Sequence, residues 1–283
     1  MAKFTLKGPR RTCLITGASS GIGERYAWHL GAELGHNLIL VARRAERLGT
    51  LSNSIDAEHR RRRPDSLPFT RVIPIDLTEE LPREQLLDDL TRLPLPVDVL
   101  VNNAGFGTLG HFALSEESRQ REMLRLNCEV PVILSRRLLP KMCEQRGGLI
   151  INVASTAAFQ PLTYMTTYGA TKAFLCSHSL ALSAEVSQHG VQVLAHCPGP
   201  TSTEFHIAAG LPTKIDLLNA MSADLVVRQA LRAVEAGRCL VVNGSRNALL
   251  AYLSRVLPAS LVAKVVGRML RPYAELAAQQ IRR

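Results

Sequence analysis

The chain has 283 residues, of which 46% are hydrophobic and 20% are charged, so it carries enough apolar side chains to form a sizeable core. That composition excludes a disordered chain, and the length is compatible with one large domain or two small ones. A formal net charge of +10 favours an anionic partner: a nucleic acid, a membrane surface or a phosphorylated small molecule.

Short β-rich segments alternate with longer helical ones from residue 12 onward. The predicted strands are apolar at consecutive positions, and they span 12–16, 37–42, 70–75, 97–101, 148–155 and 191–197. Stretches with helical periodicity lie between them, at 22–34, 44–62, 80–91, 116–144 and 165–188. This alternation predicts an α/β fold with three αβα layers, in which helices cover both faces of a doubly wound parallel sheet.

No internal repeat or linker divides the chain, so we expect a single domain over 8–245 and a C-terminal helical extension over 246–283. In the extension, apolar residues recur at helical spacing on both sides of Pro258, which predicts two short amphipathic helices broken at that proline. Basic residues interrupt the apolar pattern too often for a membrane-spanning helix. Two interpretations stay open: the helices pack over the domain or a neighbouring subunit, or they lie on an anionic membrane surface.

Charge runs and cysteine usage narrow the possible partners, metal sites and cellular compartment. The basic run 59–63 has no aromatic interleaving and no nucleic-acid motif beside it, so we interpret it as a solvated helix end and expect no nucleic-acid partner. The six cysteines form no C-x-x-C pair and no histidine stands at metal-ligand spacing, so no metal site is expected. Cysteines in apolar stretches fit a reduced, cytoplasmic compartment, and MAKFTLKGPR at the start lacks the apolar core of a secretory signal.

A glycine-rich turn, TGASSGIG at 16–23, follows the first predicted strand and opens a helix. Gly17, Gly21 and Gly23 would reverse the chain, let the backbone approach a phosphate and let helix and strand pack closely. The helix N-terminus then offers unpaired N–H groups and a positive dipole end to a pyrophosphate. Although the spacing is G-x-x-x-G-x-G, the context predicts a dinucleotide site. Three other residues of the turn are candidate cofactor contacts: Ser19, Ser20 and Ile22.

The end of the second strand indicates which dinucleotide binds. An acidic residue there commonly binds the ribose 2′-hydroxyl of NAD, whereas arginine suits the 2′-phosphate of NADP. Here Arg43 and Arg44 follow the strand and no acid does, so we predict NADP(H) as the cofactor. NAD(H) is the alternative if these arginines only begin a solvated helix.

Several motifs occur together in one order. The chain resembles the short-chain dehydrogenase/reductase family over residues 10–205, which implies a Rossmann-like fold and hydride transfer between a nicotinamide and a carbonyl or alcohol. The motifs that carry the resemblance are Thr16-Gly17-x-x-x-Gly21-x-Gly23, Asn102-Asn103-Ala104-Gly105, Asn127, Ser155, Tyr168-x-x-x-Lys172 and Pro198-Gly199.

The resemblance implies a catalytic set of four residues. Tyr168 is the general acid or base, and Lys172, one helical turn along, favours its phenolate and holds the cofactor's ribose. Because a free phenol has a pKa near 10, reaching about 7 would need roughly 4 kcal/mol from that lysine and the nicotinamide charge. Ser155 orients the substrate carbonyl, and Asn127 holds a water that relays protons to the lysine. Taken singly, Ser155 could be a helix cap and Asn127 a helix-surface amide.

Further cofactor contacts are implied by the same resemblance. Asp76, beside Leu77, matches an acid that contacts the adenine, although a turn-forming aspartate is the alternative. Ser20 departs from the basic residue that NADP-using members often have before the second glycine, and Thr201 replaces a more usual apolar residue. The remaining implied contacts follow the fourth and sixth strands, at Asn103, Ala104, Gly105, Pro198, Gly199, Thr201 and Thr203.

The expected function is an NADP(H)-dependent oxidoreductase that interconverts a ketone or aldehyde and an alcohol. The segments 106–112, 156–165 and 204–220 supply apolar residues, so we expect a hydrophobic small substrate. Two alternatives are a catalytically silent dinucleotide-binding sensor or scaffold, and a membrane-associated reductase of a lipid-like carbonyl. The resemblance also implies a homo-oligomer, a dimer or tetramer, formed through 116–144 and 165–188.

Overall fold

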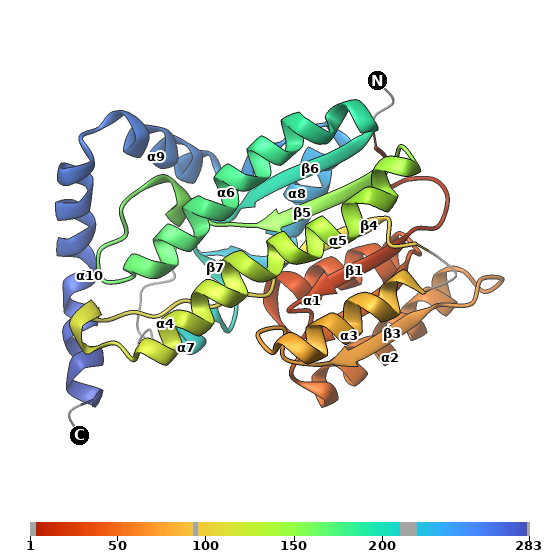
Figure 1. Cartoon of the computed structure of the whole chain (residues 1–283), viewed down its shortest axis with the longest axis horizontal. Helices are drawn as coiled ribbons and strands as arrows, with labels where there is room; N and C mark the ends of the chain where they lie inside the picture. Colours follow the sequence, from red (N-terminus) through yellow and green to blue (C-terminus); the bar gives the residue numbers. More distant parts are fainter. Residues whose placement is uncertain (1–3, 93–95, 210–219, 282–283) are drawn as a thin grey trace.

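A computed structural model of the chain describes residues 4–92, 96–209 and 220–281. Within it, seven parallel strands form one sheet in the order β3-β2-β1-β4-β5-β6-β9 (Figure 1). The strands are β1 (Thr12–Thr16), β2 (Asn37–Ala42), β3 (Thr70–Pro74), β4 (Val99–Asn102), β5 (Gly148–Val153), β6 (Val191–Cys197) and β9 (Leu240–Val242). This order confirms the predicted doubly wound parallel sheet of Rossmann-like type.

Helical segments connect the strands, and a two-residue pair, β7 (Thr201–Ser202) with β8 (Met221–Ser222), lies outside the main sheet. The longer helices are α1 (Gly21–Ala27), α2 (Ala45–Arg62), α3 (Glu80–Thr91), α4 (Glu117–Leu124), α5 (Val130–Glu144), α6 (Thr166–Val186), α8 (Ala223–Glu235), α9 (Ser245–Val256) and α10 (Ala259–Ile281). The shorter segments are η1 (Trp28–Glu33), η2 (Phe112–Leu114), η3 (Arg125–Glu129), η4 (Thr156–Phe159), η5 (Ser187–His189) and α7 (Phe205–Ala208).

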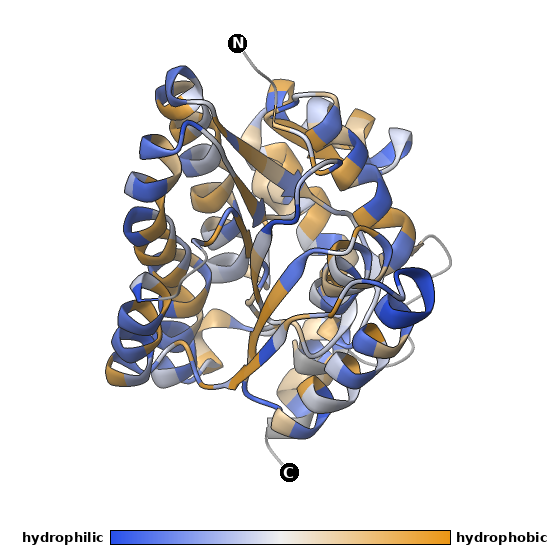
Figure 2. Cartoon of the chain, turned by 90° about the vertical axis from the view of Figure 1, so that its right-hand side faces the viewer, coloured by the Kyte–Doolittle hydropathy of each residue, from blue (hydrophilic) through white to orange (hydrophobic). Residues whose placement is uncertain are grey.

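Two apolar clusters hold the three layers together. Ile15 of β1 belongs to the cluster on one face, with α1, α2 and α8, where Leu48 and Val227 are buried. Leu14, its neighbour in β1, belongs to the cluster on the other face, with α3, α5 and α6, where Leu87 lies. Successive strand residues point to opposite faces, so burial on both sides requires the consecutive apolar positions of the sequence. Figure 2 shows strands that are largely hydrophobic between helices with mixed faces.

The strand order reverses between β1 and β4, which pair directly. In an open parallel sheet, loops that follow the strands on either side of such a reversal diverge and leave a crevice at the carboxyl edge. The glycine-rich turn follows β1, and residues 103–105 follow β4. The fold therefore brings the predicted cofactor residues to one edge of the sheet.

Some predicted boundaries differ from the structure. Strand β5 ends at Val153, so Ser155 lies beyond it, and the helices predicted at 22–34 and 116–144 contain the π-helical segments η1 and η3. Strand β9 was not predicted, because three apolar residues after a charged turn are too short a signal.

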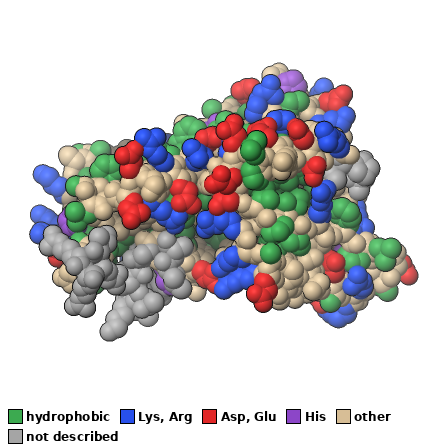
Figure 3. Space-filling model, turned by 60° about the horizontal axis from the view of Figure 1, so that its bottom comes forward, with side chains coloured by type: hydrophobic (Ala, Val, Ile, Leu, Met, Phe, Trp, Pro, Cys, Tyr) green, Lys and Arg blue, Asp and Glu red, His purple; other side chains and the backbone are tan. Residues whose placement is uncertain are grey.

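The basic run 59–63 is only partly solvated: His59 is buried and its Nδ1 lies 3.4 Å from Gly31 O. Elsewhere on the surface, basic and acidic side chains are interspersed on the face in Figure 3.

The C-terminal helices lie along one end of the molecule (Figure 1). They break between Val256 and Ala259, as the proline at 258 predicts. The prediction that the second helix is short is wrong, because α10 continues through Pro272 to Ile281. Pro272 and Arg268 are exposed, so water can satisfy the carbonyl that the proline leaves unpaired. Among the described residues, no helix combines the length and apolar character needed to cross a bilayer.

Candidate active site

Helix α6 carries the two residues at the centre of the predicted catalytic set. Tyr168 and Lys172 lie one turn apart and are only 8% and 5% exposed, so both point into the protein. The lysine Nζ lies 5.8 Å from the centroid of the tyrosine ring and donates a 2.8 Å hydrogen bond to Val153 O, at the end of β5. The structure therefore brings the predicted pair together beside the carboxyl edge of the sheet.

Ser155 sits where the chain leaves β5. It is the N-cap of η4, and its Oγ accepts a 3.1 Å hydrogen bond from Ala157 N. The Ser155 side chain is also close enough to Tyr168 to lower the pKa of the phenol. The helix-cap alternative and the catalytic prediction are therefore compatible, because the capping hydrogen bond holds the Ser155 hydroxyl beside the phenol.

Burial dominates the electrostatics of the pair in the protein itself, and the expectation that Lys172 and the nicotinamide charge together bring the pKa of Tyr168 toward 7 stays a prediction. Burial raises the pKa of Tyr168 to about 12, and the Ser155 side chain opposes that rise only in part. Burial also lowers the pKa of Lys172 to about 8. Desolvation penalises the charged form of each group, so the tyrosine holds its proton at neutral pH.

Asn127 is not a helix-surface amide. It lies in η3, is 1% exposed, and its Nδ2 donates to Phe106 O at 2.9 Å and to Thr171 Oγ1 at 3.0 Å. Its Oδ1 accepts from Phe106 N at 3.2 Å, which fixes the loop after β4 against α6. A Cβ on Gly105 would lie 2.9 Å from Asn127 Oδ1 and 3.5 Å from Lys172 Nζ. These three residues therefore meet, while a water relay between the amide and the lysine stays a prediction.

The glycine-rich turn has the backbone that its sequence predicts. Gly17 and Gly21 have φ of 64° and 58°, a region that L side chains rarely adopt. A Cβ on Gly23 would overlap Gly17 O and the Asn103 side chain, so only glycine allows the start of α1 to pack this closely. Asn103 Nδ2 donates to Gly17 O at 3.1 Å and to Thr16 O at 3.0 Å. Asn103 therefore fastens the turn to the loop after β4.

Two predicted cofactor contacts direct their side chains into the core. Leu77 is 3% exposed and belongs to the apolar cluster with α3 and α5, and Ile22 packs against the opposite cluster. Ala104 also packs against a core cluster, while its N–H donates to Thr16 Oγ1 at 3.0 Å. For these residues, any contact with a cofactor would be made by the backbone.

The two arginines after β2 point to different partners. Arg43 Nη1 lies 3.4 Å from Asp76 Oδ2 and 3.5 Å from Glu122 Oε1. Asp76 Oδ1 accepts from Thr78 N at 2.9 Å and from Thr78 Oγ1 at 2.7 Å, so the turn-forming alternative describes its geometry. Those bonds and the Arg43 guanidinium lower the pKa of Asp76 against a desolvation effect that raises it. Its contact with an adenine stays a prediction.

Arg44 lies over the glycine-rich turn. Its guanidinium donates to Ser19 Oγ at 3.1 Å and to Ser19 O at 3.3 Å, and its Nη1 donates to Glu204 Oε2 at 2.8 Å. Arg47, one turn along α2, donates to Glu204 Oε1 at 2.5 Å. Sequence reasoning missed Arg47 and Glu204, because nothing in either segment signals that they meet.

The loop after β6 closes this end of the site. Thr156 N donates to Pro198 O at 2.9 Å, and Thr201 Oγ1 donates to Gly199 O at 2.9 Å. Thr203 lies against the glycine-rich turn, because its Cγ2 would be 2.9 Å from a Cβ on Gly21. A Cβ on Gly199 would overlap the side chain of Asn247 in α9.

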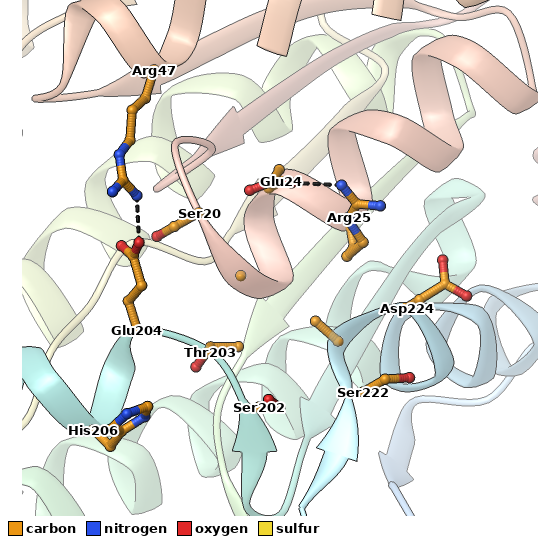
Figure 4. Close-up of a pocket in the computed structure, with 12 residues that line it drawn as sticks. Ser20, Glu24, Arg25, Arg47, Ser202, Thr203, Glu204, His206, Ser222 and Asp224 are labelled. Carbon is orange, nitrogen blue, oxygen red and sulfur yellow. Dashed lines mark hydrogen bonds and ion pairs between the residues drawn. The ribbon is translucent and has the colours of Figure 1, made fainter. Parts of the chain in front are cut away.

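A cleft of about 470 Å³ lies between the start of α1, α2, the loop after β6 and the start of α8 (Figure 4). Ser20, Gly21 and Thr203 line it, as do Arg47 and Glu204, whereas Tyr168 does not. The cleft therefore adjoins the glycine-rich turn of the predicted cofactor site. Glycines with positive φ, a helix start and nearby guanidinium groups form a donor set that fits a phosphorylated dinucleotide.

Tyr168 itself belongs to an apolar cluster. Phe106, Leu162, Met165 and Phe205 belong to it as the sequence predicts, whereas other predicted wall residues do not. Phe112 is exposed and Phe159 packs in a different cluster, while the side chains of residues 207 and 211 lie outside the described part. Among the cluster residues that sequence reasoning missed are Met123 of α4 and, from the far end of the chain, Leu270 and Tyr273 of α10.

Comparisons with known proteins agree with this geometry. A family model described as short chain dehydrogenase matches residues 11–211. The chain therefore belongs to the short-chain dehydrogenase family, a class of oxidoreductases. A very-long-chain 3-oxoacyl-CoA reductase of Phaeosphaeria nodorum is 34% identical over 194 residues, which is 66% of this chain and 54% of that protein. The chain thus spans about half the length of this relative.

Solved structures show the same similarity over most of the chain. A short-chain dehydrogenase from Sphingobium yanoikuyae in complex with NADPH is 29% identical, with a TM-score of 0.75, covering 88% of this chain and 97% of that one. A bulky-bulky ketone specific alcohol dehydrogenase from Comamonas testosteroni is 29% identical, with a TM-score of 0.71, covering 88% and 96%.

Proposed function

We propose that this chain is an NADP(H)-dependent oxidoreductase that interconverts a ketone or aldehyde and an alcohol on a hydrophobic substrate. The observation that carries the proposal is the buried Tyr168 phenol, which lies beside Ser155 and one helical turn from Lys172. That tyrosine belongs to an apolar cluster, and a turn suited to phosphates lies at the same edge of the sheet.

The residues have separable roles in reduction. A bound nicotinamide supplies the hydride. Tyr168, whose pKa of about 12 keeps it protonated at neutral pH, donates its proton to the substrate oxygen. Ser155 holds that oxygen beside the phenol by hydrogen bonding. Lys172 then stabilises the tyrosinate, and a proton from solvent restores the phenol.

The names of the relatives guide the choice of substrate. One relative is named a very-long-chain 3-oxoacyl-CoA reductase and one similar structure is titled as specific for bulky-bulky ketones. Both names fit the apolar side chains around Tyr168. Long-chain 3-oxoacyl thioesters and bulky aryl ketones are therefore the first substrates to test.

The test begins with dissociation constants for NADPH and NADH, followed by a carbonyl panel with the tighter cofactor. Tyr168→Phe should lower turnover by about 10²-fold or more while leaving NADPH binding within twofold, because the proton donor is lost and the nucleotide contacts remain. Full activity in this variant would refute the catalytic role. Tight NADPH binding by the wild type with no hydride transfer to any carbonyl would instead support the silent-sensor alternative.

We also propose that the α9–α10 layer, residues 245–276, binds an anionic membrane surface. Of the eighteen large hydrophobic side chains exposed among the described residues, ten lie in this layer. They are Leu249, Leu250, Tyr252, Leu253, Val256, Leu257, Leu261, Val265, Met269 and Leu276. Within the same layer, five basic residues stand against one acidic residue, and they are Arg246, Arg255, Lys264, Arg268 and Arg271. Apolar contact combined with positive charge suits anionic lipid.

Flotation with phosphatidylglycerol-containing and pure phosphatidylcholine vesicles tests this surface. We expect binding to the anionic vesicles only, and loss of binding in the Val256→Glu/Met269→Glu variant. Leu67→Glu, at a residue that is 81% exposed outside this layer, is the matched control and should float like the wild type. A wild type that does not float, but whose oligomeric mass falls in the double variant, would show that a second copy covers the layer.

A further inference from the structure

One carboxylate, Glu204, joins Arg47, which lines the cleft, to Arg44 beside it. Glu204 accepts from Arg44 Nη1 through one oxygen at 2.8 Å and from Arg47 Nη1 through the other at 2.5 Å. Figure 4 shows the Arg47 and Glu204 side chains reaching toward each other across the cleft from opposite walls, with Ser20 beside them. These guanidiniums are held in place by an acid of the protein itself, next to the turn that receives phosphates.

The acid belongs to the loop that reaches the catalytic tyrosine. Glu204 immediately precedes Phe205, whose ring centroid lies 5.2 Å from that of Tyr168. Phe205 N donates to Thr203 Oγ1 at 3.3 Å, and Thr203 touches the glycine-rich turn at Gly21. A change at Glu204 is therefore close to both the nucleotide end and the substrate end of the site.

The ion pairs of Glu204 with Arg44 and Arg47 are weak enough to be replaced by another anion. The side chains of Arg44, Arg47 and Glu204 are 42%, 51% and 44% exposed, so water screens their attraction, and each such pair contributes only about 0.2–1 kcal/mol. A phosphate monoester carries up to two negative charges and three acceptor oxygens, against one charge and two oxygens for a carboxylate. A phosphate that reaches these arginines would displace the carboxylate.

We propose that Glu204 is a cofactor-selectivity residue that holds Arg44 and Arg47 as an internal substitute for the 2′-phosphate of NADP(H) and is displaced by that phosphate. The inference rests on the proposed preference for NADP(H). NAD(H) has a 2′-hydroxyl in place of the phosphate, and a neutral hydroxyl does not compete for two guanidiniums. With NAD(H), Glu204 therefore stays paired and the loop stays tied to α2, whereas NADP(H) frees it.

The experiment measures dissociation constants of NADPH, NADH and adenosine 2′,5′-bisphosphate by calorimetry for the wild type and Glu204→Gln. Removing the internal competitor should tighten NADPH and the bisphosphate by about 3- to 10-fold, the size expected for two exposed pairs, and leave NADH within twofold. Glu58→Gln is the matched control: Glu58 bridges Arg61 and Arg62 at the far end of α2, so the variant has the same charge change away from the cleft.

The possible outcomes distinguish the proposed NADP(H) preference from the proposed role of Glu204. If the wild type binds NADH more tightly than NADPH, the proposed cofactor preference fails, and the response of the bisphosphate to Glu204→Gln still decides the role of the acid. If Glu204→Gln leaves the bisphosphate and NADPH unchanged, or weakens them, the displacement is overturned. An equal gain in Glu58→Gln would also overturn it, because net charge alone would then explain the result.

Discussion

The ammonium group of Lys172 donates a 2.8 Å hydrogen bond to the carbonyl oxygen of Val153. This contact ties helix α6 to the end of β5, two residues before Ser155, and so positions the serine and the tyrosine relative to each other. It also places a cation where little water reaches it, because Lys172 is 5% exposed. The site therefore carries a desolvated positive charge whose effect on stability can be measured.

The first prediction concerns that charge. Burial lowers the pKa of Lys172 to about 8 from its usual 10.5, so between those values the folded state binds fewer protons than the unfolded state. The unfolding free energy of the wild type should therefore rise relative to Lys172→Met as pH increases from 8 to 10, by up to about 3 kcal/mol. Urea unfolding of both proteins at pH 7, 8.5 and 10 checks this. Parallel pH curves would show that the lysine keeps an ordinary pKa.

His196 forms a buried polar network below the site. Asn243 Nδ2 donates to Val226 O at 3.1 Å and to Gln229 Oε1 at 3.0 Å, so its Oδ1 is the atom that faces His196 Nε2 at 2.7 Å. The proton of the neutral ring is thus on Nε2, and Nδ1 accepts from the Tyr26 hydroxyl at 2.9 Å. This assignment gives the histidine a structural role and leaves acid–base chemistry to the tyrosine.

The second prediction is loss of stability in acid. Burial lowers the pKa of His196 to about 4, so the unfolded state takes up a proton below pH 6.5 and the folded state resists it. The wild type should be more stable than His196→Gln at pH 7, and this difference should shrink by about 3 kcal/mol as pH falls toward 4. Chemical denaturation at several pH values measures it. A difference that does not change with pH would mean that the ring is accessible to protons.

The third prediction tests the meeting point of Gly105, Asn127 and Lys172. A methyl group in Gly105→Ala would lie 2.9 Å from the asparagine oxygen, so one of these residues must move. Because displacements near 1 Å can reduce rates by about 10²-fold, we expect a loss of turnover on that scale in NADPH-dependent reduction. Gly49→Ala is the control, since nothing lies within 4 Å of its Cβ position in α2; it should stabilise the fold by about 0.5–1 kcal/mol.

The sequence predicted the features that depend on neighbouring residues, such as buried strands and tight turns. Consecutive apolar residues in β1, β2, β4, β5 and β6 predict strands buried on both faces, whereas the edge strand β3 is only half-buried. The glycine-rich turn is recognisable because its backbone conformation excludes side chains. Contacts between distant segments carry no such signal. Arg47 and Glu204 are 157 positions apart, and Tyr273 reaches the cluster around Tyr168 from the far end of the chain. The direction of the tyrosine pKa shift also depended on burial, which spacing alone does not reveal.

The last prediction is a homo-oligomer formed through α4, α5 and α6. A groove of about 500 Å³ lies there, lined by apolar side chains such as Leu124 and Ile133 and by Phe174, which is 45% exposed. A second copy that buries this surface would explain why a large aromatic residue stays on it. Phe174→Asp should therefore lower the mass measured by light scattering to that of a monomer. Leu81→Asp, at an exposed leucine of α3, should keep the wild-type mass, and a wild type that is already monomeric at micromolar concentration would contradict the prediction.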